Sequence, residues 1–451
     1  MTSSSQTTLH IGFDDTDSLK GNCTTHLATK IIEKIYNRVD FLDYPRLIRN
    51  NPNVPWRTRG NGAIALTLGV KEEDLKEIIS MSIETIEELY QKDPNTNPGI
   101  AVIKGSIPLE LKEFAQRALT DVISINDAKI VAKKLCLEYH LIGNGRGIIG
   151  ALAAIGNTLS PQEEDFTFEL LTYRISHSIG TKRKVDFESI KKMDSELSPL
   201  VFNNIDEETG KAIICPTGLD PVLYGIRGEK AEVLLKALEI VQIKEPMEAY
   251  CIFRTNQGTD QHFKYSTSAI RNFNTFKGEI EVINPPRALV GGHIIFKGTV
   301  TESSKIVDVA AFEPSKSFRR IIEKLMVGDK ILAYGSVRYK REFQSFTIQL
   351  EKCEIISIAD QFKEESPFCP ECGKRMTSDG KEKGYKCRKC GQKNRHISKL
   401  KIPIVREIQL GLYIPPAQAQ RHLVKPLIRY KLPSKNTFHF VNNWWKKYAS
   451  K

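Results

Sequence analysis

Two pairs of cysteines near the C-terminus constrain the fold more tightly than any other feature of this sequence. Cys369 and Cys372 are separated by two residues, and Cys387 and Cys390 repeat that spacing after fourteen intervening residues. Two such knuckles let four thiolates surround one zinc ion tetrahedrally, which leaves no coordination position open for catalysis. The pattern predicts a zinc ribbon with a structural ion, and redox cysteines or an iron centre are the alternatives.

The remaining cysteines indicate where the chain works. Five of the nine are isolated, and an odd total with one cluster argues against a disulfide framework and for a reducing compartment. No apolar run reaches the ~20 residues that a bilayer requires. We therefore expect a cytoplasmic protein with no membrane partner.

The net charge of +12 is concentrated at the C-terminal end. Residues 361–451 hold 21 Lys and Arg against 6 Asp and Glu, so the first 360 residues are close to neutral. A basic folded segment releases counterions when it binds a polyphosphate, which makes nucleic acid the expected partner. A solvated face kept for solubility is the alternative. Within the predicted ribbon, Arg388 and Lys389 are candidates for RNA contact.

A chain of 451 residues is long enough for two to four domains. Strands and helices alternate through residue 160: we expect strands at 9–13 and 63–70, helices at 24–36 and 73–90, and a long loop over 45–62. This order predicts an α/β domain over 1–160. Residues 161–275 have the order of a smaller α+β unit of ferredoxin-like kind, so the expected fold class is multidomain α/β and α+β.

Residues 280–360 have the strand order of an OB-fold barrel. Strands are expected at 293–303, 307–312, 329–339 and 346–358, with a helix at 316–326. Such barrels bind single-stranded nucleic acid through basic and aromatic side chains, although an ordinary charged hairpin is the alternative. The candidates for this contact are Arg338, Tyr339, Lys340, Arg341 and Phe343.

The last region, 361–451, combines the ribbon with a basic C-terminal extension. From residue 406 onward the chain is rich in basic and aromatic residues, and we expect a helical extension. It would either contact RNA or pack on the ribbon.

Three carboxylates, Asp14, Asp15 and Asp17, lie where the first strand ends and the first helix begins. Like charges so close together are tolerated only if a cation neutralises them or the loop is solvated. Magnesium bound to nucleotide phosphates is the expected cation, and a helix-capping cluster is the alternative. Thr24 and Thr25 place hydroxyl groups at the helix start, where free N–H groups favour an anion, unless a threonine merely caps the helix.

Two glycine-rich loops, 53–62 and 143–147, supply further candidates. They contain Arg59, Asn61 and Arg146 next to glycines that let the backbone approach a ligand. Neither loop fits a Walker A or dinucleotide-binding pattern, and turn chemistry explains each of them equally well.

Longer strings make the sequence specific. Nearly the whole chain contains, in this order, the strings GFDDTDS followed by CTT, PRLIRNNPNVPWRTRGNGA, GNGRGIIGALAAIG, DFTFELLTYR, DPVLYGIRGE, RTNQGTDQH and the two CxxC pairs. Together they resemble the archaeal isoleucine tRNA 2-agmatinylcytidine synthetases. The resemblance implies a kinase-like catalytic domain, a ferredoxin-like domain, an OB-fold and a zinc ribbon, and it implies an enzyme.

The reaction that the resemblance implies is ATP-dependent. Agmatine is conjugated to C2 of the wobble cytidine of the isoleucine tRNA with a CAU anticodon, after phosphorylation activates the base, so that the codon AUA is read. The implied cofactors are ATP, Mg²⁺ and structural Zn²⁺. The OB-fold and ribbon would grip the acceptor stem, and the anticodon loop would reach the N-terminal domain.

The resemblance also implies roles for individual residues. Catalytic roles fall on Asp14, Asp15, Asp17, Thr24 and Asp165, with Thr24 as the threonine that members of the family autophosphorylate. ATP or phosphate binding falls on Gly12, Thr16, Ser18, Arg59, Asn61 and Arg146. Glu169 is a further acidic candidate, and Arg227 and Arg254 are looser phosphate or RNA candidates.

A second hypothesis comes from a different class of protein. In it the chain is a non-catalytic single-stranded nucleic-acid-binding protein that uses its OB-fold and ribbon, and the N-terminal half is a scaffold. The carboxylate loop argues for the enzyme, because a scaffold has no reason to place three like charges at the end of a strand.

Overall fold

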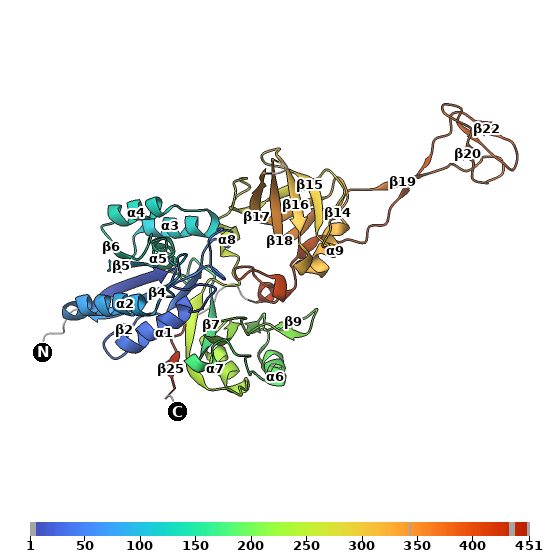
Figure 1. The fold of residues 1–451 in the computed structure, drawn as a ribbon. Coiled ribbons are helices and arrows are strands. Elements are labelled where there is room, and N and C mark those ends of the chain that lie inside the picture. Colours follow the sequence, from blue (N-terminus) through green and yellow to red (C-terminus); the bar gives the residue numbers. More distant parts are fainter. Residues whose placement is uncertain (1–5, 342–343, 433–437, 449–451) are drawn as a thin grey trace.

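The computed structural model describes residues 6–341, 344–432 and 438–448. The chain forms a body around one long sheet, a small barrel beside it, and a ribbon carried away from both on a two-stranded stalk (Figure 1). In the described part of the chain, no helix is long and apolar enough to cross a membrane.

The N-terminal half of the body alternates strands and helices, as the sequence predicts. Its strands are β1 (Gln6–Asp14), β2 (Asp40–Phe41), β3 (Arg46–Arg49), β4 (Gly62–Lys71), β5 (Gly99–Lys104) and β6 (Glu138–Leu141). Its helices are α1 (Thr24–Ile35), α2 (Leu75–Leu89), α3 (Leu109–Thr120), α4 (Ile125–Lys134) and α5 (Ile148–Gly156). Helices α3, α4 and α5 lie on one side of the sheet, and α1 and α2 lie on the other (Figure 1).

Helix α5 is apolar on every side and is almost fully buried. It packs directly against β1: a Cβ added to Gly12 would lie 2.3 Å from the carbonyl oxygen of Ala151. Only glycine permits that approach. Gly12 therefore serves the packing of strand on helix.

The second half of the body continues the same sheet. Its elements are β7 (Thr167–Arg174), α6 (Phe187–Leu197), β8 (Val201–Phe202), β9 (Ile205–Asp206), β10 (Lys211–Ala212), β11 (Val222–Gly228), α7 (Ala231–Ile240), β12 (Met247–Thr255) and the short α8 (Gln261–Lys264). The strand order is β6-β5-β1-β4-β3-β12-β7-β11-β8. β9 and β10 form a separate two-stranded sheet.

One short strand joins the two halves. The expected loop over 45–62 is wrong in part, because it contains β3, which pairs antiparallel with β4 and parallel with β12. This strand is short, and its parallel partner lies some two hundred residues away, so local patterning does not reveal it. The expected domain boundary at residue 160 therefore falls within one continuous sheet.

The barrel contains β13 (Thr275–Val282), β14 (Arg287–Ala288), β15 (Ile294–Val300), β16 (Ile306–Ala311), β17 (Lys330–Lys340) and β18 (Ser345–Ser357). It closes because β13 pairs with both β15 and β17, while β16 pairs in parallel with β18. Helix α9 (Ser317–Glu323) lies between β16 and β17, as predicted. β13 was not predicted from the sequence, so the barrel begins before the expected residue 280.

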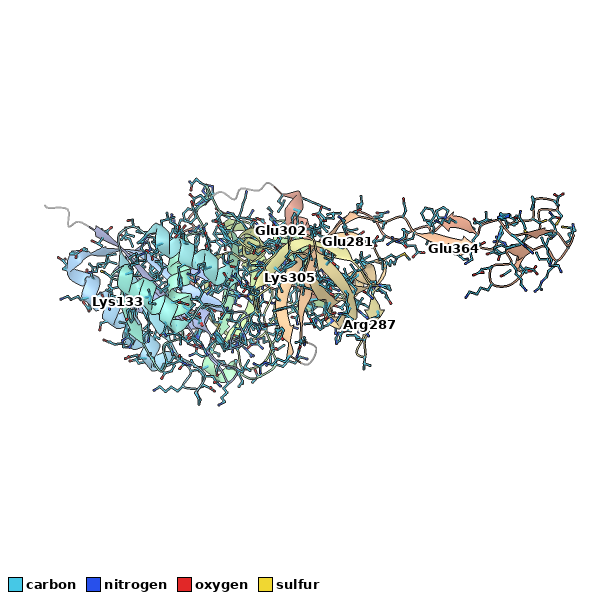
Figure 2. The ribbon with its side chains drawn as sticks, turned by 90° about the horizontal axis from the view of Figure 1, so that it is seen from above. Lys133, Glu281, Arg287, Glu302, Lys305 and Glu364 are labelled. Carbon is cyan, nitrogen blue, oxygen red and sulfur yellow. The ribbon has the colours of Figure 1, made fainter. Side chains whose placement is uncertain are left out.

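The ribbon stands apart from the rest of the molecule. Strands β19 (Phe362–Glu365) and β23 (Leu400–Pro403) pair to form the stalk, and the ribbon holds β20 (Thr377–Ser378), β21 (Tyr385–Lys386) and β22 (Lys393–Asn394). Figure 2, seen from above, shows Glu364 on the stalk well beyond the barrel and on the far side from Lys133 of the body.

The C-terminal segment, described over residues 411–432 and 438–448, returns from the stalk to the body. It forms β24 (Gly411–Tyr413) against β18, 3-10 turns at Ala417–Ala419 and Leu427–Lys431, and β25 (Trp445–Lys447) against β12. Trp444 is buried beside the rings of Phe41 and Tyr44. The expected helical extension is wrong in the described residues, which form short strands and 3-10 turns, and the aromatic stretch packs on the body sheet and not on the ribbon. The alternative expectation, contact with RNA, stays a prediction.

Candidate active site

A cavity of about 860 Å³ opens between the two halves of the body and the C-terminal segment. Most of the candidates from the N-terminal sequence line it. They are Asp14, Asp15, Asp17, Thr24, Arg59, Asn61 and Arg146, joined by Glu169 and Arg227 from the second half of the body. Residues 417–422 of the C-terminal segment supply another part of the lining.

Asp14 and Asp15 lie at the end of β1, where the chain turns sharply. Asp15 adopts a left-handed backbone conformation, with φ 59°, and its N–H donates to Asp14 Oδ1 at 2.7 Å. Asp14 Oδ2 lies so close to α5 that a Cβ on Gly150 would come within 1.9 Å of it. Burial, reinforced by the neighbouring Asp15, raises the pKa of Asp14 well above its usual range.

Asp15 is held by an arginine fork. Arg146 donates from Nε to Asp15 Oδ2 at 2.9 Å and from Nη2 to Oδ1 at 3.0 Å, and Nη2 also donates to the Asn95 carbonyl at 2.7 Å. Burial raises the pKa of Asp15, and Arg146 opposes that shift. Arg146 is thus a counter-charge that orients the acidic loop.

Asp17 connects the loop to Thr24. Its Oδ1 accepts from Thr58 Oγ1 at 3.0 Å and lies 3.5 Å from Thr24 Oγ1, at the long limit for a hydrogen bond. Thr24 is the first residue of α1, and Thr16 donates to its hydroxyl at 3.1 Å. The Thr24 hydroxyl therefore lies next to a carboxylate and a helix N-terminus.

Arg59 joins Asp17 to Asp220, a cavity residue that the sequence analysis missed as a candidate. Arg59 Nη1 lies 3.5 Å from Asp17 Oδ2 and 3.1 Å from Asp220 Oδ2, and it donates to the Asn22 carbonyl at 2.7 Å. Burial is the main cause that raises the pKa of Asp17, and Asp220 adds to it. We call the carboxylates Asp14, Asp15, Asp17 and Asp220 the acidic wall.

The cavity has a second wall of opposite sign. Arg49, Arg57 and Arg227 line it, and we call them the basic wall. Arg227 Nε lies 3.2 Å from Glu169 Oε1, and Arg49 Nη2 lies 3.8 Å from Glu169 Oε2. Two guanidinium groups therefore share one carboxylate, which leaves net positive charge facing the cavity. Arg49 ends β3 and Arg57 lies in the loop that follows it, and in this stretch the sequence offered only Arg59 and Asn61 as site candidates.

Several expected site residues lie outside this lining. Thr16 and Ser18 support the loop from behind, and Gly12 contacts α5. Asp165 pairs with Arg429 Nη2 at 2.9 Å and Lys425 Nζ at 3.1 Å, so it anchors the C-terminal segment. Arg254 pairs with the buried Asp43.

The RNA candidates of the barrel divide into two kinds. Arg338 donates to the Asn53 carbonyl at 2.9 Å and lies over the Phe273 ring, so it joins barrel to body. Lys340 and Arg341 are exposed, and the exposed Tyr339 packs on Phe346. Phe343 lies outside the described residues. In the ribbon, Arg388 and Lys389 are exposed.

The four ribbon cysteines have the geometry of a metal site. The sulfurs of Cys369 and Cys390 are 3.5 Å apart, as are those of Cys372 and Cys387, and all four lie within 4.8 Å of one another. Tetrahedral zinc with bonds of ~2.3 Å places its sulfurs about 3.8 Å apart. Among the residues that the structure describes, the carboxylates of the acidic wall do not lie close enough together to form a cluster of this kind.

Comparison with known proteins identifies three regions of the chain. The family description TiaS TCKD domain matches residues 10–143, the TiaS FLD domain matches 145–262, and the TiaS C-terminal zinc ribbon domain matches 366–408. The isoleucine-tRNA 2-agmatinylcytidine synthetase TiaS of Archaeoglobus fulgidus is 39% identical over 95% of this chain and 99% of its own. The enzyme of the same name from Methanosarcina mazei is 41% identical over 93% of this chain and 97% of its own.

Solved structures agree with the sequence matches. A crystal structure of TiaS in complex with its isoleucine tRNA and ATP superimposes with a TM-score of 0.85 at 38% identity, covering 96% of this chain and all of the other. A complex of TiaS with the same tRNA, AMPCPP and agmatine gives a TM-score of 0.81 at 36% identity over the same shares.

Proposed function

This chain belongs to the TiaS family of isoleucine-tRNA 2-agmatinylcytidine synthetases, and we propose how the two walls of its cavity divide the reaction. It is an enzyme that conjugates agmatine to an isoleucine tRNA in an ATP-dependent reaction, and this tRNA and agmatine are its partners. The alternative of a non-catalytic nucleic-acid-binding protein leaves the acidic wall without a purpose.

The acidic wall receives Mg²⁺ together with the nucleotide. Three of its buried carboxylates have raised pKa values, so their charged forms are poorly stabilised by the protein alone. A divalent cation supplies the missing charge, and it prefers carboxylate and phosphate oxygens. Arg146 already forms a two-point pair with Asp15, and Arg59 lies closer to Asp220 than to Asp17, so Asp14 and Asp17 are the carboxylates that would hold the metal.

The chemistry follows from the substrate. The C2 oxygen of cytosine is a poor leaving group, and transfer of a phosphoryl group from ATP to that oxygen corrects this. The agmatine amine then forms a bond to C2, loses a proton, and the oxygen departs with the phosphoryl group as inorganic phosphate. The modified wobble base pairs with A, so that AUA is read.

The protein contributes positioning and charge to these steps. The arginines of the basic wall bind phosphoryl oxygens, which concentrate negative charge in the transition state. The Thr24 hydroxyl, beside Asp17 and at the start of α1, is placed to accept a phosphoryl group. Extruding the wobble base costs a few kcal/mol, less where the base is unpaired in a loop.

The remaining domains deliver the tRNA. We assign residues 1–160 to a kinase-like domain, 161–275 to a ferredoxin-like domain and 280–360, extended to include β13, to an OB-fold. The exposed Lys340 and Arg341, with Arg388 and Lys389 on the distant ribbon, supply basic contacts for the acceptor stem. The enzyme works in the cytoplasm, with structural Zn²⁺ in the ribbon.

The observation that carries the assignment of the walls is that one cavity joins the acidic loop, Thr24 and the arginines. The test uses radiolabelled ATP, agmatine and a transcript of the isoleucine tRNA with Asp17→Asn and Thr24→Ala. Both changes should abolish modification of the tRNA and leave the affinity for tRNA near that of the wild-type enzyme. The matched control Asp127→Asn, in the exposed capping box of α4, should retain activity. Full activity in Asp17→Asn would remove the acidic wall from the mechanism.

A further inference from the structure

The C-terminal segment contributes to the cavity in a way that its position in the chain does not suggest. Gln418, Gln420 and His422 line the cavity, although the zinc ribbon match ends at residue 408 and none of the three family descriptions reaches them. His422 lies beside the backbone of Gly60, where a Cβ would come within 2.7 Å of its ring. Its ring therefore borders both the arginine-rich loop and the cavity.

The structure holds this part of the segment firmly. The Gly258 N–H donates to the His422 carbonyl at 2.8 Å, and the Asp260 N–H donates to the Leu423 carbonyl at 2.8 Å. A few residues further on, Arg429 makes ion pairs with Asp165 and Glu229. Backbone hydrogen bonds and the buried Arg429 thus anchor the main chain that carries His422.

The geometry also fixes which nitrogen of His422 carries the proton. Arg227 Nη2 lies 2.7 Å from His422 Nδ1. A guanidinium group has only donors, so Nδ1 must be the acceptor and the proton resides on Nε2. Burial and the nearby Arg49, Arg227 and Arg57 lower the pKa of His422 well below its usual value, which keeps the ring neutral.

A neutral acceptor has a consequence for charge. Glu169 and His422 together engage Arg227 through Nε and Nη2, but only Glu169 carries a negative charge, and it is shared with Arg49. The buried Nε of Arg49 has no hydrogen-bond partner among the described residues. A carboxylate in place of His422 would orient Arg227 equally well and would cancel the charge that attracts an anion.

We propose that His422 is a positioning residue, which orients Arg227 as a ligand for a phosphoryl group without neutralising it. The inference rests on the proposed roles of the two walls. It adds a specific residue, from a segment outside the matched domains, that completes the phosphate-binding side of the cavity.

The test compares steady-state kinetics of the intact enzyme and of His422→Phe, which keeps a ring and removes the acceptor. We expect kcat to fall by about 10- to 100-fold, the loss typical of one hydrogen bond to a charged group. The KM for agmatine should stay within about twofold, because Arg227 acts on the phosphoryl group. The matched control His140→Asn, on β6 and paired with Glu87, should behave as the unmodified enzyme. An unchanged kcat in His422→Phe would overturn the inference.

A double-substitution cycle distinguishes positioning from a merely structural role. If His422 acts through Arg227, then His422→Phe combined with Arg227→Lys should be no slower than Arg227→Lys alone, within about twofold. Losses that multiply would contradict the inference. Should the Phe variant fail to fold, ¹⁵N-histidine NMR of the unmodified enzyme reports the tautomer directly. An Nε2–H ring that stays neutral at mildly acidic pH is expected, and a protonated Nδ1 would overturn the proposal.

These outcomes are separable from those of the proposed function. Full activity of Asp17→Asn or Thr24→Ala would remove the role assigned to the acidic wall. Normal dependence on Asp17 and Thr24, together with full activity of His422→Phe, would remove only the role given to His422.

Discussion

Replacing Arg59 with methionine tests whether counter-charge holds the acidic wall together. Arg59 Nη1 lies 3.1 Å from Asp220 and 3.5 Å from Asp17, whose side chains are only 9% and 10% exposed. Removing one partner from a buried ion pair costs about 3–5 kcal/mol. We expect the lower end, about 3 kcal/mol, because Arg59 itself is 24% exposed and Asp17 keeps its hydrogen bond to Thr58.

The stability that Arg59→Met loses relative to the wild-type protein, which we call the deficit, should depend on pH. Burial and Asp220 already raise the pKa of Asp17 above 3.8, and Arg59 opposes them, so the substitution raises this pKa further. A carboxyl group with a higher pKa in the folded than in the unfolded protein favours folding as pH falls through the raised pKa toward its ordinary value. The deficit of Arg59→Met should therefore be largest near neutral pH and should shrink in mild acid.

Unfolding in urea measures the loss of stability without screening the charges, because urea is uncharged. The fluorescence of Trp56 at the cavity and of Trp444 in the body core reports the unfolding transition. Arg59→Lys is the matched control, which keeps the positive charge and removes the guanidinium group. Equal deficits at about pH 7.5 and pH 5.5 would refute the electrostatic explanation. So would a deficit below about 1 kcal/mol at the higher pH, the value of an ordinary surface pair.

Three further substitutions or treatments test other parts of the account. Asp165→Asn should weaken the anchoring of Arg429 and lower the urea midpoint. The kcat should change little, because Glu229 still pairs with Arg429 and Asp165 lies outside the cavity lining. A loss of kcat of about 100-fold with normal stability would indicate a catalytic role for Asp165. Gly12→Ala should destabilise the body by about 1–3 kcal/mol or more, because the new Cβ meets the Ala151 carbonyl, and unchanged thermal unfolding would contradict that packing. Chelation of zinc should weaken tRNA binding in filter assays. The urea transition of the body should stay in place, because the stalk separates the ribbon from the body (Figure 1). Undiminished affinity for tRNA after zinc removal would exclude the ribbon from the tRNA interface.

The local motifs could be recognised in the sequence because each acts over a few residues. The acidic loop, Thr24 and the two glycine-rich loops meet in one cavity because a strand end, a helix start and a tight turn each follow from nearby sequence. The ribbon follows from four cysteines in the same way. Their spacing alone determines which atoms meet.

The parts that sequence did not reveal depend on distant contacts. Strand β3 needs β12 as its parallel partner, and β25 needs the edge of β12 to become a strand. The resemblance implies a catalytic role for Asp165, but its carboxylate pairs with Arg429, far along the chain, and lies outside the cavity lining. His422 enters the cavity by the same return of the C-terminal segment, and its neighbours in sequence carry no sign of it.

The most direct measurement is a crystal structure of this enzyme with a non-hydrolysable ATP analogue and Mn²⁺ in place of Mg²⁺. Anomalous scattering then locates the metal without reference to the protein. We predict Mn²⁺ bound to the phosphate chain and to carboxylate oxygens of Asp14 or Asp17, at about 2.1–2.2 Å. A metal and nucleotide bound elsewhere, with the acidic wall unchanged and Arg59 and Arg146 still on its carboxylates, would contradict the division of labour between the two walls.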